Sequence, residues 1–273
     1  MVRSRRLELP RDLSHSDLNA ARLPIPPRPH SSFSFHLLKG SGKPEIANLS
    51  ACYKRVYTEM KMRTSPNTSN LIEWKSQKEW ISYPEALNLM EQHVKALQDQ
   101  KACESIWLIE HPPLYTLGSR GQEKDVFPSA KFPTFKSGRG GQVTYHGPGQ
   151  RVVYVMLDLN TRYKDLKRYV FNLEEWIILV LRHFDIQGER REGRIGIWVQ
   201  KKGKDHKIAA IGVRVQKWVT SHGFALNVDP DLGAYKDIIP CGLSQYGITS
   251  LQDLGVRASM SEVDRILRQT CPF

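Results

Sequence analysis

The chain has 273 residues, of which 40% are hydrophobic and 25% are charged, and its formal net charge is +12. These values are ordinary for a globular protein and exclude a low-complexity chain, and no apolar run approaches the roughly 18–20 residues that span a bilayer. Four cysteines stand without paired spacing, which argues against a zinc site and a disulfide framework and favours a reducing compartment. They are Cys52, Cys103, Cys241 and Cys271.

Residues 1–70 differ from the rest of the chain. They carry 12 Lys/Arg against 5 Asp/Glu, a charge of +7, whereas residues 71–273 carry 28 against 23, a charge of +5. Five prolines between Pro10 and Pro29 interrupt any periodicity, so the composition predicts disorder or a non-native extension. Residues 5–30 resemble a translated tRNA gene, which places the expected start at Met60 or Met62. We expect a cytoplasmic protein, or an organellar one if the extension is a targeting segment.

Residues 71–256 predict a single domain of the α+β class, and residues 257–273 predict a C-terminal helix or tail. Ser82 and Glu85 have the spacing of a capping box, and Pro84 occupies the first turn of the helix that follows. Apolar periodicity predicts further helices over 164–185 and 261–268. β-rich runs predict strands over 105–109, 115–117, 152–157, 195–199, 208–215 and 223–228.

A glycine-rich stretch covers residues 138–150, with five glycines and one proline in thirteen residues. Exposed backbone N–H groups in such a loop can hold an anion or a carbonyl oxygen. The stretch matches neither the dinucleotide-binding fingerprint nor the P-loop. Tight turns around a hairpin explain the glycines equally well, and His146 and the later His222 are interpreted as hydrogen-bonding loop residues.

Cys241 lies between Pro240 and Gly242, on a turn that can project a thiol into a cleft. A thiol becomes a good nucleophile when a nearby ammonium lowers its pKa, and Lys207 is the candidate for this role. The strand that Lys207 begins has small residues, Ala209 and Ala210, which leave room for a ligand. The pattern indicates acyl transfer through a thioester, although a buried structural cysteine and a solvated lysine are the simpler alternatives.

Six segments in this order resemble the lipoyl(octanoyl) transferase family, also called lipoate biosynthesis protein B, which is related in fold to the biotin and lipoate protein ligases and to class II synthetases. The segments are 111–118, 139–150, 196–199, 207–214, 222–228 and 240–242. The resemblance covers about residues 72–256, and it implies that 71–256 is a catalytic domain built on a mixed sheet flanked by helices. Ile195 departs from the family, which often has a small or polar residue there, and this departure bears on local packing.

The resemblance implies that octanoyl passes from octanoyl-acyl-carrier-protein to Cys241 and then to a lysine of an apo lipoyl domain. The acceptors would be 2-oxoacid dehydrogenases and the glycine-cleavage H protein, with Lys207 lowering the pKa of the thiol. We also expect a monomer that needs no metal and no cofactor and that binds neither nucleic acid nor a membrane. The implied substrate-binding residues are Arg139, Gly140, Gly141, Gln142, Val143, Thr144, Tyr145, His146, Ala210, Ile211, Gly212, Gly223, Phe224 and Ala225.

Two other functions fit the sequence less well. An ATP-dependent lipoate or biotin protein ligase would form an acyl-adenylate and would not need Cys241. A binding module for lipoyl domains or nucleic acid would perform no chemistry. A nucleic-acid binder would lose affinity steeply with salt, and more than half of the excess charge lies in residues 1–70.

Overall fold

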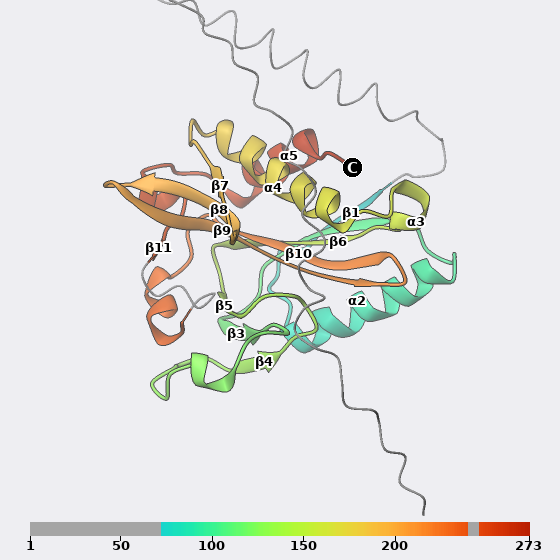
Figure 1. The fold of residues 1–273 in the computed structure, drawn as a ribbon, viewed down its shortest axis with the longest axis horizontal. Coiled ribbons are helices and arrows are strands. Elements are labelled where there is room, and N and C mark those ends of the chain that lie inside the picture. Colours follow the sequence, from blue (N-terminus) through green and yellow to red (C-terminus); the bar gives the residue numbers. More distant parts are fainter. Residues whose placement is uncertain (1–71, 240–245) are drawn as a thin grey trace, which may run out of the picture. The chain divides into compact units, whose positions relative to one another are not determined.

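The computed structural model describes residues 72–239 and 246–273, so the expected start at Met60 or Met62 and the predicted nucleophile Cys241 lie outside the described residues. Figure 1 shows the arrangement of the elements. The strands are β1 (Glu73–Ser76), β2 (Ser105–Ile109), β3 (Leu114–Leu117), β4 (Thr134–Lys136), β5 (Val143–His146), β6 (Gln150–Met156), β7 (Glu189–Arg191), β8 (Arg194–Lys201), β9 (Lys204–Gln216), β10 (Val219–Asn227) and β11 (Gly247–Ile248). The α-helices are α2 (Tyr83–Gln98), α3 (Leu159–Arg162), α4 (Leu166–Arg182) and α5 (Met260–Thr270).

The main sheet has the strand order β1-β2-β6-β10-β9-β8-β7, and β11 adds to β9. The β1–β2 and β9–β11 pairs are parallel, and the other pairs are antiparallel. A second sheet has the order β4-β3-β5 and also mixes the two directions. The predicted α+β class with a mixed sheet is therefore confirmed, and all six predicted strands are present within one or two residues at most ends.

Helices cover both faces of the main sheet, with α4 and α5 on one face and α2 on the other (Figure 1). The α4 face holds the larger core, centred on Trp176, whose indole N–H donates to the carbonyl of Leu267 in α5 at 3.0 Å. On the other face, Met90 and Val94 of α2 pack against a cluster that includes Tyr154. Residues 260–270 thus belong to the same core as α4.

Helix ends follow local chemistry in one case and not in another. Asp165 caps α4, because its carboxylate accepts the backbone N–H of Arg168 at 3.0 Å. The predicted start of α2 at Ser82 is confirmed, but the predicted capping box is wrong: the Ser82 hydroxyl makes no bond to the helix backbone and instead points to Glu85 Oε2 at 3.5 Å. Proline in the first turn is sufficient to preset the helical φ there.

The α-helices of the described ranges are short or strongly amphipathic, and not one of them is both long and apolar enough to cross a membrane.

Candidate active site

A cleft of about 620 Å³ opens where the small sheet meets strands β6, β9 and β10 of the main sheet. It holds Lys207, the residue predicted to lower the pKa of the thiol, and thirteen of the fourteen predicted substrate-binding residues, which come from three separate stretches of the chain. Those thirteen are Arg139, Gly140, Gly141, Gln142, Val143, Thr144, His146, Ala210, Ile211, Gly212, Gly223, Phe224 and Ala225. The antiparallel β9–β10 pairing brings two of the stretches together, since Gly212 lies opposite Gly223.

Tyr145 is the residue that the cleft does not include. Successive side chains of a strand point to opposite faces, so Tyr145 points away from the face of Thr144 and His146. Its ring packs against Tyr235, with the ring centroids 5.4 Å apart, and against Tyr115 at 5.9 Å. Tyr145 therefore packs on the face of the small sheet opposite the cleft. Strand alternation would have predicted that it does not line the cleft with Thr144 and His146.

Several lining residues were missed by the sequence interpretation. Tyr83 comes from α2, Tyr154 from β6, and Leu166 and Val170 from one face of α4. Leu166 and Val170 are four residues apart, so they share a helix face, but the sequence alone does not say that this face ends at a cleft. The alternation of Tyr154 with Val153 and Val155 was the signal that places it opposite the α4 core.

Arg139 shapes the glycine-rich loop from inside. Its side chain is buried, and its guanidinium donates to the carbonyls of Thr116 at 2.8 Å, Gln142 at 3.0 Å and Gly140 at 2.9 Å. A Cβ on Gly212 would lie 3.0 Å from Arg139 Cδ and 3.0 Å from the Gly140 oxygen. The glycine in β9 thus lets the loop approach the sheet closely, and that approach forms one wall of the cleft.

Histidines and tyrosines form a buried polar layer in and behind the lining of the cleft. His111 Nδ1 donates to the Ile81 carbonyl at 2.7 Å, so in the neutral ring Nε2 accepts from Tyr154 Oη at 2.8 Å. His146 Nδ1 lies 2.7 Å from Gln150 Oε1. His146 and His222 lie in strands β5 and β10, so their interpretation as loop residues was wrong. Burial lowers the pKa of His146 well below its usual value and that of His222 to about 3.

We expect the buried neutral histidines to make the fold sensitive to acid. A folded pKa below the unfolded one means that the unfolded chain binds more protons, so the free energy of unfolding falls as pH drops from about 6.5 towards about 3 for His222. Each proton that the unfolded chain binds and the folded chain does not lowers the free energy of unfolding by about 1.4 kcal/mol per pH unit. Since His222 has a φ of 58°, His222→Asn keeps a residue that tolerates this conformation. Urea unfolding between pH 4 and 6 should show a shallower pH slope for the variant; equal slopes would contradict the assignment.

Lys207 lies on β9 and is 5% exposed. A bulge between β8 and β9 lets Lys207 pair with Trp198 while Ala209 pairs with Ile197, so the extra residue redirects the strand at this point. The Lys207 Nζ lies 4.8 Å from the centroid of the Trp198 ring, which is a cation–π contact. Thr249, just after β11, donates its backbone N–H to the Lys207 carbonyl at 3.0 Å and fixes the main chain.

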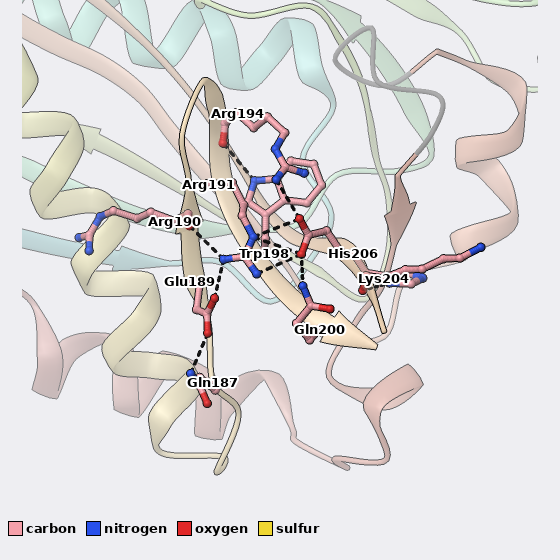
Figure 2. A network of polar contacts seen from close by, with 10 residues as sticks. Gln187, Glu189, Arg190, Arg191, Arg194, Trp198, Gln200, Lys204 and His206 are labelled. Atoms are coloured by element: carbon pink, nitrogen blue, oxygen red, sulfur yellow. Dashed lines mark hydrogen bonds and ion pairs between the residues drawn. The ribbon is translucent and has the colours of Figure 1, made fainter. Parts of the chain in front are cut away.

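Trp198 is itself held by a polar network on β7, β8 and β9, which Figure 2 shows. Its indole N–H donates to the Arg194 carbonyl at 3.0 Å, and the Arg194 guanidinium lies 4.9 Å from the ring centroid. Arg194 also donates to Asp205 at 2.8 Å, and Arg191 binds the same carboxylate through Nε and Nη2. The hydrogen bonds from Arg191 lower the pKa of the Asp205 carboxyl, which stays charged. The network therefore fixes the ring beneath the Lys207 amine.

The remaining cysteines differ in what they can do. Cys103 is exposed, and burial raises the pKa of the Cys271 thiol to about 11, which makes Cys271 a poor nucleophile at neutral pH. Cys241 and Gly242 lie outside the described residues, but the flanking residues are anchored. Ile239 donates its N–H to the Asp125 carbonyl at 2.8 Å, and the Tyr246 ring meets Trp198 edge-on at 5.4 Å. Residues 72–239 and 246–273 contain no group of three His, Cys, Asp or Glu side chains arranged for a metal ion.

Comparison with known proteins identifies the family. The sequence profile of the family described as "Lipoyl protein ligase A/B catalytic domain" matches residues 82–271, which run from the cap of α2 through α5. The chain belongs to this family. The lipoyl protein ligase A/B match includes every described segment that lines the cleft, and the resemblance to this group inferred from the sequence is confirmed.

Relatives within the lipoyl protein ligase A/B family are similar over most of their length. An octanoyltransferase of Paramagnetospirillum magneticum is 52% identical over 202 residues, which cover 74% of this chain and 95% of the relative. An octanoyltransferase of Nitrobacter hamburgensis is 54% identical over 205 residues, 73% of this chain and 85% of the relative. A solved bipartite lipoate protein ligase of Thermoplasma acidophilum superposes with a TM-score of 0.56 at 14% identity and covers 73% of this chain and 82% of its own. This likeness confirms the ligase-related fold.

Proposed function

We propose that this chain is an acyltransferase that moves an octanoyl group from an acyl carrier protein to a lysine of an apo lipoyl domain, through a thioester on Cys241. The observation that carries the proposal is a buried amine, Lys207, fixed over an aromatic ring at one side of a cleft that is partly apolar. The choice of octanoyl as the transferred group rests on the octanoyltransferases that are 52% and 54% identical to this chain. Ile211 and Phe224 give the eight-carbon chain apolar surface to bury, at about 0.8 kcal/mol per methylene.

In the first step the Cys241 thiolate attacks the carbonyl carbon of the octanoyl thioester. The new C–S bond forms, the bond to the carrier's sulfur breaks, and the leaving thiolate takes a proton from the Lys207 ammonium. Lys207 becomes neutral in this transfer, because the negative charge of the Cys241 thiolate is lost when the thioester forms. Backbone N–H groups of the glycine-rich loop are candidates to stabilise the tetrahedral oxyanion, at about 3–4 kcal/mol for each donor.

In the second step the acceptor lysine attacks the Cys241 thioester. The C–N bond forms, the C–S bond breaks, and neutral Lys207 accepts the proton that the amine loses, which restores the thiolate and ammonium pair. A thioester is more reactive than the amide that replaces it, so neither step needs ATP. Splitting the transfer in two also means that the two carriers never have to meet in one complex.

Chain geometry is consistent with a thiol close to Lys207. Cys241 is five residues before Tyr246, a distance of at most about 18 Å along an extended chain, and Tyr246 contacts the ring beneath the Lys207 amine. A solved lipoate protein ligase of Thermoplasma acidophilum and a lipoate-protein ligase A bound with ATP are 14% and 15% identical to this chain, a likeness that extends to the fold alone.

The proposal is tested by mass spectrometry of the full chain incubated with octanoyl-acyl-carrier-protein without ATP. We expect one octanoyl adduct on Cys241 that apo lipoyl domain discharges. Cys241→Ala should form no adduct, whereas Cys103→Ala, which removes an exposed thiol, should behave as the wild type. Transfer that requires ATP, or that persists in Cys241→Ala, would refute the thioester mechanism in favour of a ligase.

A further inference from the structure

Exposed apolar side chains gather at the mouth of the cleft. Leu166 at the start of α4 is 43% exposed and Ile195 on β8 is 53% exposed, and both line the cleft. Figure 1 shows α4 beside the hairpin of β7 and β8. Leu166 and Ile195 are called the rim below.

Positive charge lies beside the rim at the start of α4, where Lys164, Lys167 and Arg168 stand against Asp165, the cap of the helix. The arginines beside Ile195 are ion-paired: Arg190 with Glu174 and Glu175, Arg191 with Glu189 and Asp205, and Arg194 with Asp205. Among the described residues that line the cleft, the charged side chains are Arg120, Arg139, Arg194 and Lys207, with no carboxylate. An apolar patch beside a cleft whose charged lining residues are all basic is complementary to a partner that has apolar and acidic side chains.

The size of the cleft determines what must rest on the rim. A volume of about 620 Å³ is within the range of small-molecule sites and far below that of a folded domain. An acyl group and part of its flexible arm fit inside, so the domain that carries them has to sit outside, against the mouth. Exposed large apolar side chains at such a position are typical of protein interaction sites.

We propose that the rim, together with Arg120, which also lines the cleft, docks the folded, acidic domain of the acyl donor while the acyl chain enters the cleft. This inference rests on the proposed function and adds the surface that recognises the donor. Ile195 is the chain's own contribution: it was expected to affect strand packing, but it is exposed at the mouth, where an apolar side chain adds contact area for a docked domain.

The test compares two octanoyl donors that share the reacting thioester. One is octanoyl-acyl-carrier-protein; the other is the octanoyl thioester of N-acetylcysteamine, which enters the cleft without a protein domain. The rate constant kcat/KM for acyl-enzyme formation is measured by mass spectrometry for the wild type and for Leu166→Ser combined with Ile195→Ser. The control is Leu89→Ser, which alters an equally exposed leucine (41%) on α2 that does not line the cleft.

We expect the double variant to lose at least tenfold more kcat/KM with the carrier protein than with the small thioester, and Leu89→Ser to leave the ratio of the two unchanged. Arg120→Glu should lower the rate with the carrier protein further and reduce its dependence on salt. Equal losses with both donors, or no loss with either, would overturn the docking surface while leaving the proposed function intact. A wild-type protein that is loaded by neither donor would overturn both.

Discussion

Replacing Lys207 by alanine is expected to slow octanoyl transfer by about 10²–10⁴-fold at pH 7, the range that positioned proton transfer contributes. The ammonium stabilises the thiolate in the first step, and the neutral amine accepts a proton in the second. Without it, the pKa of the thiol returns towards about 8.5 and only a few per cent is ionised at neutral pH. When single-turnover loading is measured from pH 6 to 9.5, the loading rate of Lys207→Ala should therefore rise towards that of the wild type at high pH. The wild-type rate should show no such rise.

Lys207→Arg separates the two roles. Arginine keeps the positive charge but does not release its proton in a protein. We expect this variant to load octanoyl faster than Lys207→Ala and then to discharge it slowly to a lipoyl domain. Lys204→Ala is a matched control, since Lys204 lies on the same strand and is exposed. If Lys207→Ala loads octanoyl at the wild-type rate, the Lys207 amine has no role in the mechanism.

Gly196→Ala is expected to lower the free energy of unfolding by about 2–4 kcal/mol, the sum of an unfavourable backbone conformation and overpacking. Gly196 has a φ of 114°, and a Cβ there would lie 2.6 Å from the Ala209 oxygen and 3.3 Å from Lys207 Cε. The clash falls beside the bulge where Trp198 pairs with Lys207, so the amine should be displaced together with the strand. Urea unfolding and single-turnover loading measure the two effects.

Gly203→Ala provides the control for this prediction. Gly203 also has a positive φ, 74°, but a Cβ there would meet nothing within 4 Å. It should show the cost of the backbone conformation alone, about 1 kcal/mol, with loading unchanged. If the two variants are destabilised equally, crowding against Lys207 is not what requires the glycine at position 196.

The sequence indicated the elements and several of their ends. The apolar stripe of α4 and the β-rich runs of β2, β6 and β10 predict those elements, because burial on one face leaves a local period in the sequence. The predicted capping box at Ser82 was wrong, although the helix does begin there. A capping box requires side-chain orientations as well as spacing, and the Ser82 hydroxyl turns towards Glu85.

The order of the motifs, and the family that they indicate, were determined by the sequence alone, since each motif is a short local pattern. Only the tertiary structure decided which residues share the cleft, because pairing between β9 and β10 and the approach of the glycine-rich loop are contacts between distant segments. The same contacts turned Tyr145 into the core, brought Trp198 beneath Lys207 and exposed Ile195 at the mouth. Strand register and the β8–β9 bulge set these orientations, and neither leaves a period that a single chain displays.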